Sequence, residues 1–416
     1  MSVSEQVIDT QSEITHAQLE ERAARLRQPG KPFRLGFFTQ VPSRADHPAR
    51  RTYDELVETI VAAEDLGYDS VWIGQHHFSP EDGGVPSPLV VLAAAAARTS
   101  RIHLGTAVIA LPFEHPIRLA EDLAVLDEIS GGRVQIGLGG ARGDLQAFNT
   151  FGVDFAARHD LFDRNLEVLH HLLEGRSCAD FVQLPTVRVK DSVTPVTSHQ
   201  LSTSDSVAGQ QASADVEPKR LFPGAPKLRG RIWQTASSED RARRIARNRN
   251  GLMIGAFHDH VIFHQLRFIV GYLEEWLTLN GNLDEARVGA QRFTYHAESA
   301  DAIVEELSPH VSATQETLAA RFPQLGSLSP KEYLRSVTRI GDSRDIVVQL
   351  RNDPALLGFV TDFFPTTGLF PSVREGTSGA DLDVERLRVF AEEIAPELGW
   401  KPTAYGRNSV RRDSNN

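Results

Sequence analysis

Cysteine is almost absent from this chain of 416 residues, and Cys178 is the only one. A disulfide within the chain is therefore impossible. Long apolar runs are absent too, because the longest, residues 88–97, is shorter than the roughly eighteen residues that span a bilayer. The first thirty residues are polar and lack the apolar centre of a secretory signal. We therefore expect a cytoplasmic protein.

Basic residues are in the minority. The chain has 44 lysines and arginines against 55 acidic residues, which gives a formal net charge of −11 at pH 7. Proteins bind nucleic acids and anionic membranes mainly through lysine and arginine. The densest basic run, residues 241–249, falls on an expected helix, where a solvated face is the simpler interpretation. The sequence predicts neither a nucleic-acid partner nor a membrane partner.

Short apolar runs alternate with longer helical patterns from residue 33 onward. Strands are expected at 33–39, 70–73, 102–111, 134–138, 231–235, 252–255, 288–295 and 358–363. Helical segments follow each of them, including 158–173 after the fourth strand and 381–398 after the last. Such alternation implies a parallel sheet covered by helices, and eight units favour a closed barrel. The predicted fold class is α/β, a (β/α)8 TIM-type barrel.

One barrel domain over residues 31–400 accounts for this pattern. We expect residues 1–30 to be a polar N-terminal extension and residues 401–416 a polar C-terminal tail. Two insertions interrupt the barrel: the polar segment 182–229 after helix four, and a long connection after strand seven. Loops of such length are usually functional lids or unstructured, and for 182–229 both interpretations stay open.

Function in such barrels lies in the loops that follow the strands. Two histidines, His76 and His77, follow the second strand. Adjacent side chains at a strand end point in different directions, so these two do not suit one metal ion. The sequence His258-x-His260 has a metal-binding spacing but opens a late helix. We predict no metal site, and a metal-dependent hydrolase stays a remote alternative.

Two loops could bind phosphate. After the fourth strand, the run GLGGARG over residues 137–143 has Arg142 where a dinucleotide-binding loop has its third glycine. It is either a glycine-rich turn or an anion site formed by backbone N–H groups and Arg142. After the fifth strand, TASSE over residues 235–239 leads into a helix, where Ser238 would be a competent N-cap. Clustered hydroxyls at a helix start also suit a phosphate.

Residues 70–158 closely resemble the bacterial luciferase-like, flavin-dependent monooxygenases. The matching stretches read SVWIGQHHF, IHLGTAVIALPFEHPIRLAEDLAVLDEISGGRVQIGLGG and ARGDLQAFNTFGVD. Weaker matches run over residues 232–255 and through IGDSRDIVVQL and FAEEIAPEL. Clear similarity covers about a quarter of the chain, and diffuse similarity covers most of the rest.

This resemblance implies a two-component monooxygenase. Such an enzyme takes reduced FMN from a separate NAD(P)H:flavin reductase and uses O2 to oxygenate a small organic substrate through a flavin C4a-(hydro)peroxide. The protein orients the ring and excludes water. A homodimer is expected by analogy. Light emission needs a second, non-identical subunit, so we expect oxygenation without useful bioluminescence.

The resemblance also implies roles for individual residues. His76 matches the catalytic histidine, and His77 beside it has either a packing role or a direct chemical one. Ala107 and Val108 fall where the family often has a non-prolyl cis peptide beside the flavin ring. The other cofactor-binding residues implied are Arg142, Arg158, Gln234, Thr235, Ser237 and Ser238. Compared with luciferase, this chain has two extra residues before Arg142, and Gln234 stands where luciferase has a glutamate. A position on the helix surface explains Arg158 equally well.

Two further functions stay open on the same barrel. One is an F420-dependent dehydrogenase or reductase, which transfers hydride and ignores O2, and the other is a non-catalytic flavin-binding relative. The sequence does not identify the substrate. Phe37, Phe38 and Phe78 suggest an apolar pocket wall, although core packing explains them equally well.

Overall fold

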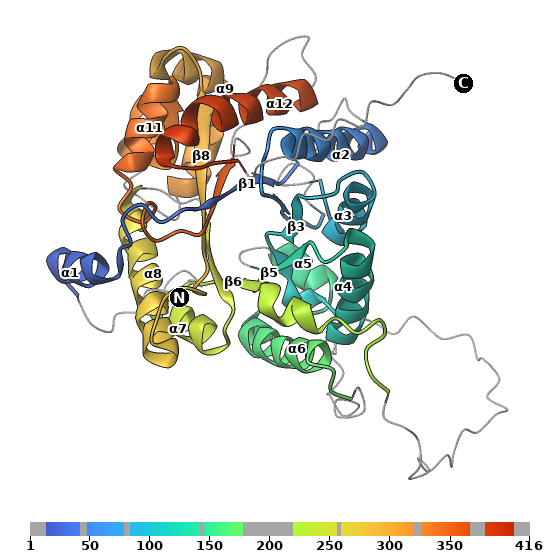
Figure 1. Ribbon diagram of the computed structural model, residues 1–416. Helices are drawn as coiled ribbons and strands as arrows, with labels where there is room; N and C mark the ends of the chain where they lie inside the picture. Colours follow the sequence, from blue (N-terminus) through green and yellow to red (C-terminus); the bar gives the residue numbers. More distant parts are fainter. Residues whose placement is uncertain are drawn as a thin grey trace, which may run out of the picture.

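Eight parallel strands form a closed ring at the centre of the computed structural model (Figure 1). The ring consists of β1 (Arg34–Thr39), β2 (Ser70–Ile73), β3 (His103–Thr106), β5 (Val134–Gly139), β6 (Ile232–Thr235), β7 (Gly251–Ile254), β8 (Val288–His296) and β10 (Asp362–Thr366). Strand β10 pairs with both β1 and β8, which closes the ring. The predicted (β/α)8 barrel is confirmed. The structure describes residues 14–41, 48–78, 84–141, 145–177, 219–255, 259–319, 326–366 and 379–402.

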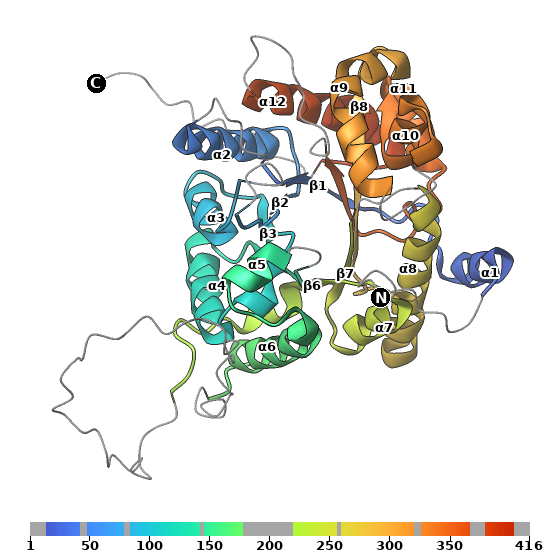
Figure 2. The ribbon, with the colours of Figure 1, turned by 180° about the vertical axis from the view of Figure 1, so that it is seen from behind.

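Helices surround the ring. They are α2 (Ala49–Asp65), α3 (Pro88–Ala96), α4 (Pro116–Ser130), α5 (Leu145–Thr150), α6 (Arg158–Leu173), α7 (Glu239–Arg247), α8 (Asp259–Asn280), α9 (Ala300–Ala319), α10 (Pro330–Val337), α11 (Ser343–Arg351) and α12 (Gly379–Val389). In both views, α2, α3 and α4 lie on one side of the barrel and α7 and α8 on the other (Figures 1 and 2). None of the described helices is long and apolar enough to cross a membrane.

The segments around the last strand differ from the sequence prediction. The expected strand at 358–363 is wrong by about four residues, since β10 begins at Asp362. Residues 354–359 form turns, and Gly358 has a φ of +84°, which ends any extended run. Phe359 and Val360 are apolar because they are buried, not because they pair with a strand. Strand β9 (Arg339–Gly341), which pairs with the end of β8, was not predicted.

The N-terminal extension contributes a helix to the outer wall. Helix α1 (His16–Leu26) begins with a capping box between Thr15 and Gln18 and buries Leu19 completely. Arg22 donates to both carboxylate oxygens of Glu274 on α8, at 2.8 Å each. Of the polar insertion, residues 219–229 are described, and they include the start of a 3-10 helix (Pro226–Arg231). Its remainder and residues 403–416 of the tail lie outside the described residues.

Four aromatic side chains and one methionine fill the inside of the ring. We call Phe38, Trp72, Trp233, Met253 and Phe364 the aromatic plug. The Trp72 ring lies 5.6 Å from that of Trp233 and 5.0 Å from that of Phe364. Glycines on neighbouring strands make room: a Cβ at position 105 would lie 2.4 Å from Trp72, and one at 251 would lie 2.4 Å from Trp233. The inside of the barrel is therefore a packed core and not a channel, so a ligand of the barrel would bind at its mouth.

Candidate active site

The predicted site residues follow four neighbouring strands of the ring. Because all eight strands are parallel, the loops after β2, β3, β5 and β6 open at the same end of the barrel. His76 and His77 follow β2, Ala107 and Val108 follow β3, and Thr235 ends β6. Arg142, which follows β5, lies outside the described residues. The order of the strands thus brings most of the predicted residues to one mouth.

The peptide bond between Ala107 and Val108 is cis, as their position in the resemblance implied. This segment packs closely on β5. The Thr106 hydroxyl donates to the Gly137 carbonyl at 2.9 Å and accepts from the Gly137 N–H at 3.0 Å. A Cβ at position 139 would lie 2.4 Å from Val108 Cγ2. Close packing against β3 and Val108 explains why residues 137 and 139 are glycines, without a bound nucleotide. At these two positions it favours the glycine-rich turn over the anion site.

Gly137→Ala is expected to lower the free energy of unfolding by roughly 2 kcal/mol or more, because overpacking a rigid site costs about 1–3 kcal/mol. The added Cβ would lie 2.0 Å from the Thr106 carbonyl oxygen, a backbone atom that cannot rotate away. Urea unfolding measures the change. Gly140→Ala is the matched control, since a Cβ there meets nothing within 4 Å. Equal stability of the two variants would contradict this packing argument.

Gln75 holds the loop that carries the two histidines. Its Oε1 accepts from the Ala110 N–H at 2.7 Å, and its Nε2 donates to the Pro86 carbonyl and to Glu114 Oε1 at 3.2 Å each. The His76 N–H donates to the Val85 carbonyl at 3.3 Å. These bonds join the loop after β2 to strand β4 (Ile109–Ala110) and to the start of α3. The half-buried His76 side chain therefore rests on a fixed backbone.

His77 lies among phenylalanines. Its ring centroid is 4.9 Å from Phe151, 5.8 Å from Phe113 and 6.0 Å from Phe78. The contacts with Phe113 and Phe151 are edge-to-face, the arrangement that aromatic pairs prefer. This environment supports the packing role for His77 more than the chemical one.

The start of α7 forms the other side of the mouth. Ser238 is the N-cap, as predicted, and accepts from the Arg241 N–H at 3.2 Å. Thr235 and Ser237 are exposed. Burial would raise the pKa of Glu239 in the first turn, but hydrogen bonds from Arg22, Arg267 and Arg243 lower it to about 2. Three guanidinium groups thus compensate the Glu239 charge, which would otherwise repel an anion at this helix start.

Gln234 does not face the inside of the mouth. Side chains alternate along a strand, and Trp233 beside it belongs to the aromatic plug. Gln234 therefore points towards the surrounding helices, where it is 5% exposed. Within the described part of the chain, its Nε2 has no hydrogen-bond partner. Its predicted contact with a cofactor has no support from this geometry.

Three cationic or titratable side chains gather where α6 and α7 begin. The Arg158 guanidinium stacks 3.9 Å from the Phe155 ring centroid and donates to the Phe155 carbonyl at 2.9 Å. Partial burial and the charges of Arg241 and Arg158 lower the pKa of His159. Neither His159 nor Arg241 was predicted from the sequence as a site residue. Arg241 belongs to the basic run that we interpreted as a solvated face, so its position at a helix start was the available signal.

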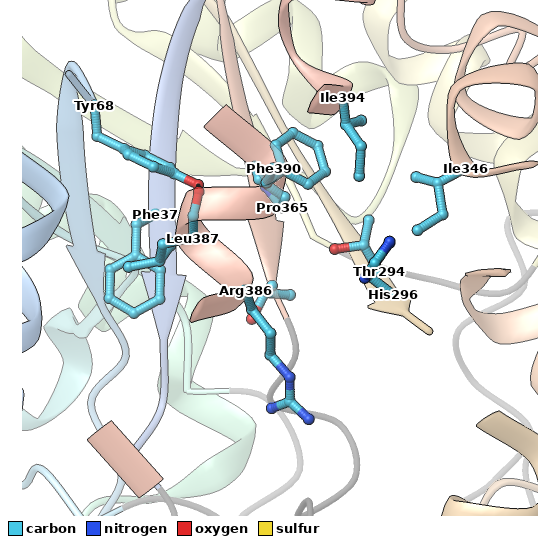
Figure 3. Close-up of a pocket in the computed structure, with 11 residues that line it drawn as sticks. Phe37, Tyr68, Thr294, His296, Ile346, Pro365, Arg386, Leu387, Phe390 and Ile394 are labelled. Carbon is cyan, nitrogen blue, oxygen red and sulfur yellow. The ribbon is translucent and has the colours of Figure 1, made fainter. Parts of the chain in front are cut away.

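A separate pocket lies outside the ring (Figure 3). Apolar side chains of β1 and α12 line it, among them Phe37 and Leu387, and Arg386 and His296 also border it. None of the predicted site residues lines this pocket. Among the described residues, no group of histidine, cysteine, aspartate and glutamate could hold a metal ion. His258 of the His258-x-His260 pair lies outside them.

Comparison with known proteins extends this description. The family model for luciferase-like monooxygenases matches residues 33–352. The 4-hydroxyprotoasukamycin monooxygenase of Streptomyces nodosus subsp. asukaensis is 37% identical over 138 residues, which are 33% of this chain and 34% of that protein. The oxygenase component of the flavin-dependent trigonelline monooxygenase of Acinetobacter baylyi is 35% identical over 111 residues, 26% of this chain and 30% of that protein. The chain thus matches about a third of the length of these relatives.

Solved structures share the fold at low identity. Monooxygenase RslO1 from Streptomyces bottropensis aligns with a TM-score of 0.64 and 21% identity, over 88% of this chain and 99% of that one. The oxygenating constituent of 3,6-diketocamphane monooxygenase from Pseudomonas putida, in complex with FMN, gives 0.63 and 16% over the same shares. The F420-dependent tetrahydromethanopterin reductase of Methanopyrus kandleri gives 0.60 and 18%, over 88% and 100%. Since the family match covers most of its length, this chain belongs to the luciferase-like monooxygenases.

Proposed function

We propose that this protein is the oxygenase component of a two-component monooxygenase that uses reduced FMN and O2 to oxygenate a small organic substrate. One observation carries the proposal: three features meet at one barrel mouth. They are the His76 loop after β2, the Ala107–Val108 segment after β3, and the exposed hydroxyls at the start of α7. The relative from Acinetobacter baylyi is itself an oxygenase component, and the diketocamphane enzyme was solved with FMN. A separate flavin reductase is the expected partner.

The residues present fit a flavin phosphate and ring. The hydroxyls of Thr235 and Ser237 and N–H groups at the start of α7 would bind the phosphate, with Arg158 and Arg142 as candidate cations. Half-buried Ala107 and Val108 pack against the aromatic plug and would support the ring. The plug excludes water from below. Bound reduced flavin supplies the activation of O2, and His76 would hold or relay a proton at the reacting atoms.

A titration under anaerobic conditions tests this proposal. Reduced FMN should raise the melting temperature of the protein, and the variant Thr235→Val/Ser237→Ala should weaken reduced FMN binding by about tenfold or more, since a hydrogen bond to a charged group contributes roughly 1.5–3 kcal/mol. F420 enzymes share this fold, so reduced F420 is the necessary comparison. A larger shift with F420 would replace the oxygenase with a hydride-transferring dehydrogenase. If neither cofactor shifts the melting temperature, both the oxygenase and the dehydrogenase are rejected.

We also propose a homodimer formed through α3 and α4. Helix α3 consists only of apolar residues, yet Val90 is 69% exposed. On the neighbouring α4, Val125 is 46% and Ile129 is 56% exposed. Apolar faces of this kind usually meet a partner. On the same helix, Arg118 pairs with Asp122, so these two exposed charges already compensate each other within the chain. A cytoplasmic location stays a prediction from the composition.

Light scattering checks the dimer. The wild-type protein should have twice the mass of one chain, and Val90→Asp combined with Ile129→Asp should give single chains, because a buried unpaired charge is costly. Val348→Asp on α11 is the matched control, since Val348 is 49% exposed on another helix. A dimer that survives the double substitution would place the interface elsewhere.

A further inference from the structure

We propose that Phe78 and Phe151 form an apolar subsite at the rim of the barrel mouth, which binds the hydrocarbon body of a neutral substrate. This proposal rests on the proposed function, because it names the substrate class for the same mouth. Phe78 follows β2 directly after the two histidines, and Phe151 follows α5, which comes after β5. Both side chains therefore belong to loops at the carboxyl ends of the strands.

The two rings belong to a continuous aromatic cluster. Phe78 and Phe151 lie 5.5 Å apart, and Phe151 stacks on Phe113 at 4.8 Å with an interplanar angle of 20°. Phe113 in turn contacts Phe148 at 4.7 Å. We call these four residues the aromatic rim. Since Phe148 is buried and Phe113 half-buried, the rim is anchored in the core and presents a fixed wall.

Exposure singles out two members of the rim. Phe78 is 55% exposed and Phe151 is 41% exposed, although exposed phenylalanine is unfavourable in water. Phe78 also has a φ of +61°, a left-handed conformation that residues other than glycine rarely adopt. The chain therefore holds a large apolar side chain in water, on an unfavourable backbone, in the same loop as His76. Such a position is typical of a binding site.

The exposed area indicates a small ligand. A phenylalanine side chain offers about 150–250 Å², so the exposed parts of these two rings amount to roughly 200 Å². Small-molecule sites are lined mainly by apolar and aromatic side chains. The rim lies at the barrel mouth and not on an outer helical face, and its exposed area suits a small molecule.

Charge at the rim indicates a neutral substrate. The Arg158 guanidinium stacks on Phe155 and donates to the Phe155 carbonyl, so its described contacts are with Phe155 and not with Phe78 or Phe151. The Gln75 amide already donates to the carboxyl of Glu114, whose pKa is raised by burial. An ionic group bound against these four phenylalanine rings would lose water, and none of the rings offers a counter-ion. A predominantly hydrocarbon molecule meets no such cost.

Fluorescence titration with the neutral probe N-phenyl-1-naphthylamine tests the subsite without any flavin. Phe78→Ser and Phe151→Ser should each weaken probe binding about tenfold, because each substitution removes roughly half of the exposed apolar surface of the subsite. Phe151→Leu, which keeps an apolar side chain, should retain most of the affinity and guards against a folding defect. Phe222→Ser is the matched control, because Phe222 is 88% exposed outside the rim. Equal probe affinity in all four variants overturns the proposal.

Flavin binding separates this proposal from the proposed function. Reduced FMN should bind Phe78→Ser as tightly as it binds the wild-type protein, because the phosphate side of the mouth is unchanged. If reduced FMN binds and the probe ignores the rim substitutions, the subsite is wrong and the oxygenase stands. If the rim substitutions release the probe but no reduced flavin binds, the apolar subsite stands and the oxygenase is wrong.

Discussion

Replacing His76 with alanine is expected to slow oxygenation by about a hundredfold or more, while the affinity for reduced FMN stays within about twofold. A positioned general acid or base typically contributes 10² to 10⁴ in rate. An imidazole side chain suits this purpose because one ring nitrogen can accept a proton while the other donates one. The loop itself should not move, since Gln75 and the backbone of Val85 hold it without the His76 side chain. Oxygen uptake with a supplied flavin reductase measures the rate, on a substrate found by screening for uptake above the peroxide background.

The neighbouring histidine provides the control for this experiment. His77→Phe keeps a ring among Phe113 and Phe151, so activity should be largely retained if His77 only packs. Equal loss of activity in the two variants would show that the loop acts as a unit and that His76 has no special role. Unchanged turnover in His76→Ala would remove the catalytic assignment altogether. Anaerobic titration of both variants with reduced FMN excludes a simple loss of the cofactor.

Elements with local signals could be predicted from the sequence. The strand at 70–73 and the helix at 158–173 agree with β2 and α6 at both ends. The apolar run at 358–363 could not be placed, because a buried turn and a buried strand have the same composition. Its true strand is defined by pairing with β1 and β8, residues that are distant in the chain. The pattern of apolar residues gave the fold class, and non-local pairing set this boundary.

Site geometry was predictable only in part, for a similar reason. The sequence placed Thr235 and Ser238 at a helix start, and Ser238 is the N-cap. It could not show that Gln234 turns away from the mouth, since both faces of a barrel strand are buried and no polar–apolar alternation marks the inner one. Glu239 contacts Arg22, which is 217 residues away in the chain, and Arg267, which is 28 residues away. Such contacts leave no local pattern.

Asp353→Asn is expected to lower the free energy of unfolding by about 3–5 kcal/mol, the usual cost of breaking a buried ion pair. Asp353 accepts from Arg292 Nε at 2.6 Å and from Arg339 Nη2 at 3.2 Å, and its side chain is fully buried. The arginines lie on β8 and β9, so the carboxylate joins the barrel to the strand outside it. Asparagine would remove the carboxylate charge that faces two buried guanidinium groups. Urea unfolding at pH 7 measures the loss.

The pH dependence of that loss tests its electrostatic cause. Burial would raise the pKa of Asp353, but the charge and hydrogen bonds of Arg292, the charge of Arg339 and the Ala355 N–H lower it from 3.8 to about 2. The carboxylate therefore stabilises the fold above about pH 4, by roughly 2.4 kcal/mol, and this contribution is lost as the pH falls towards 2. The gap between wild-type protein and Asp353→Asn should narrow by about 1 kcal/mol between pH 5 and pH 3. Asp122→Asn on the exposed surface of α4 should show no such narrowing, because its ion pair with Arg118 is solvated. A gap that stays constant with pH would mean that the variant is destabilised by altered packing and not by lost charge.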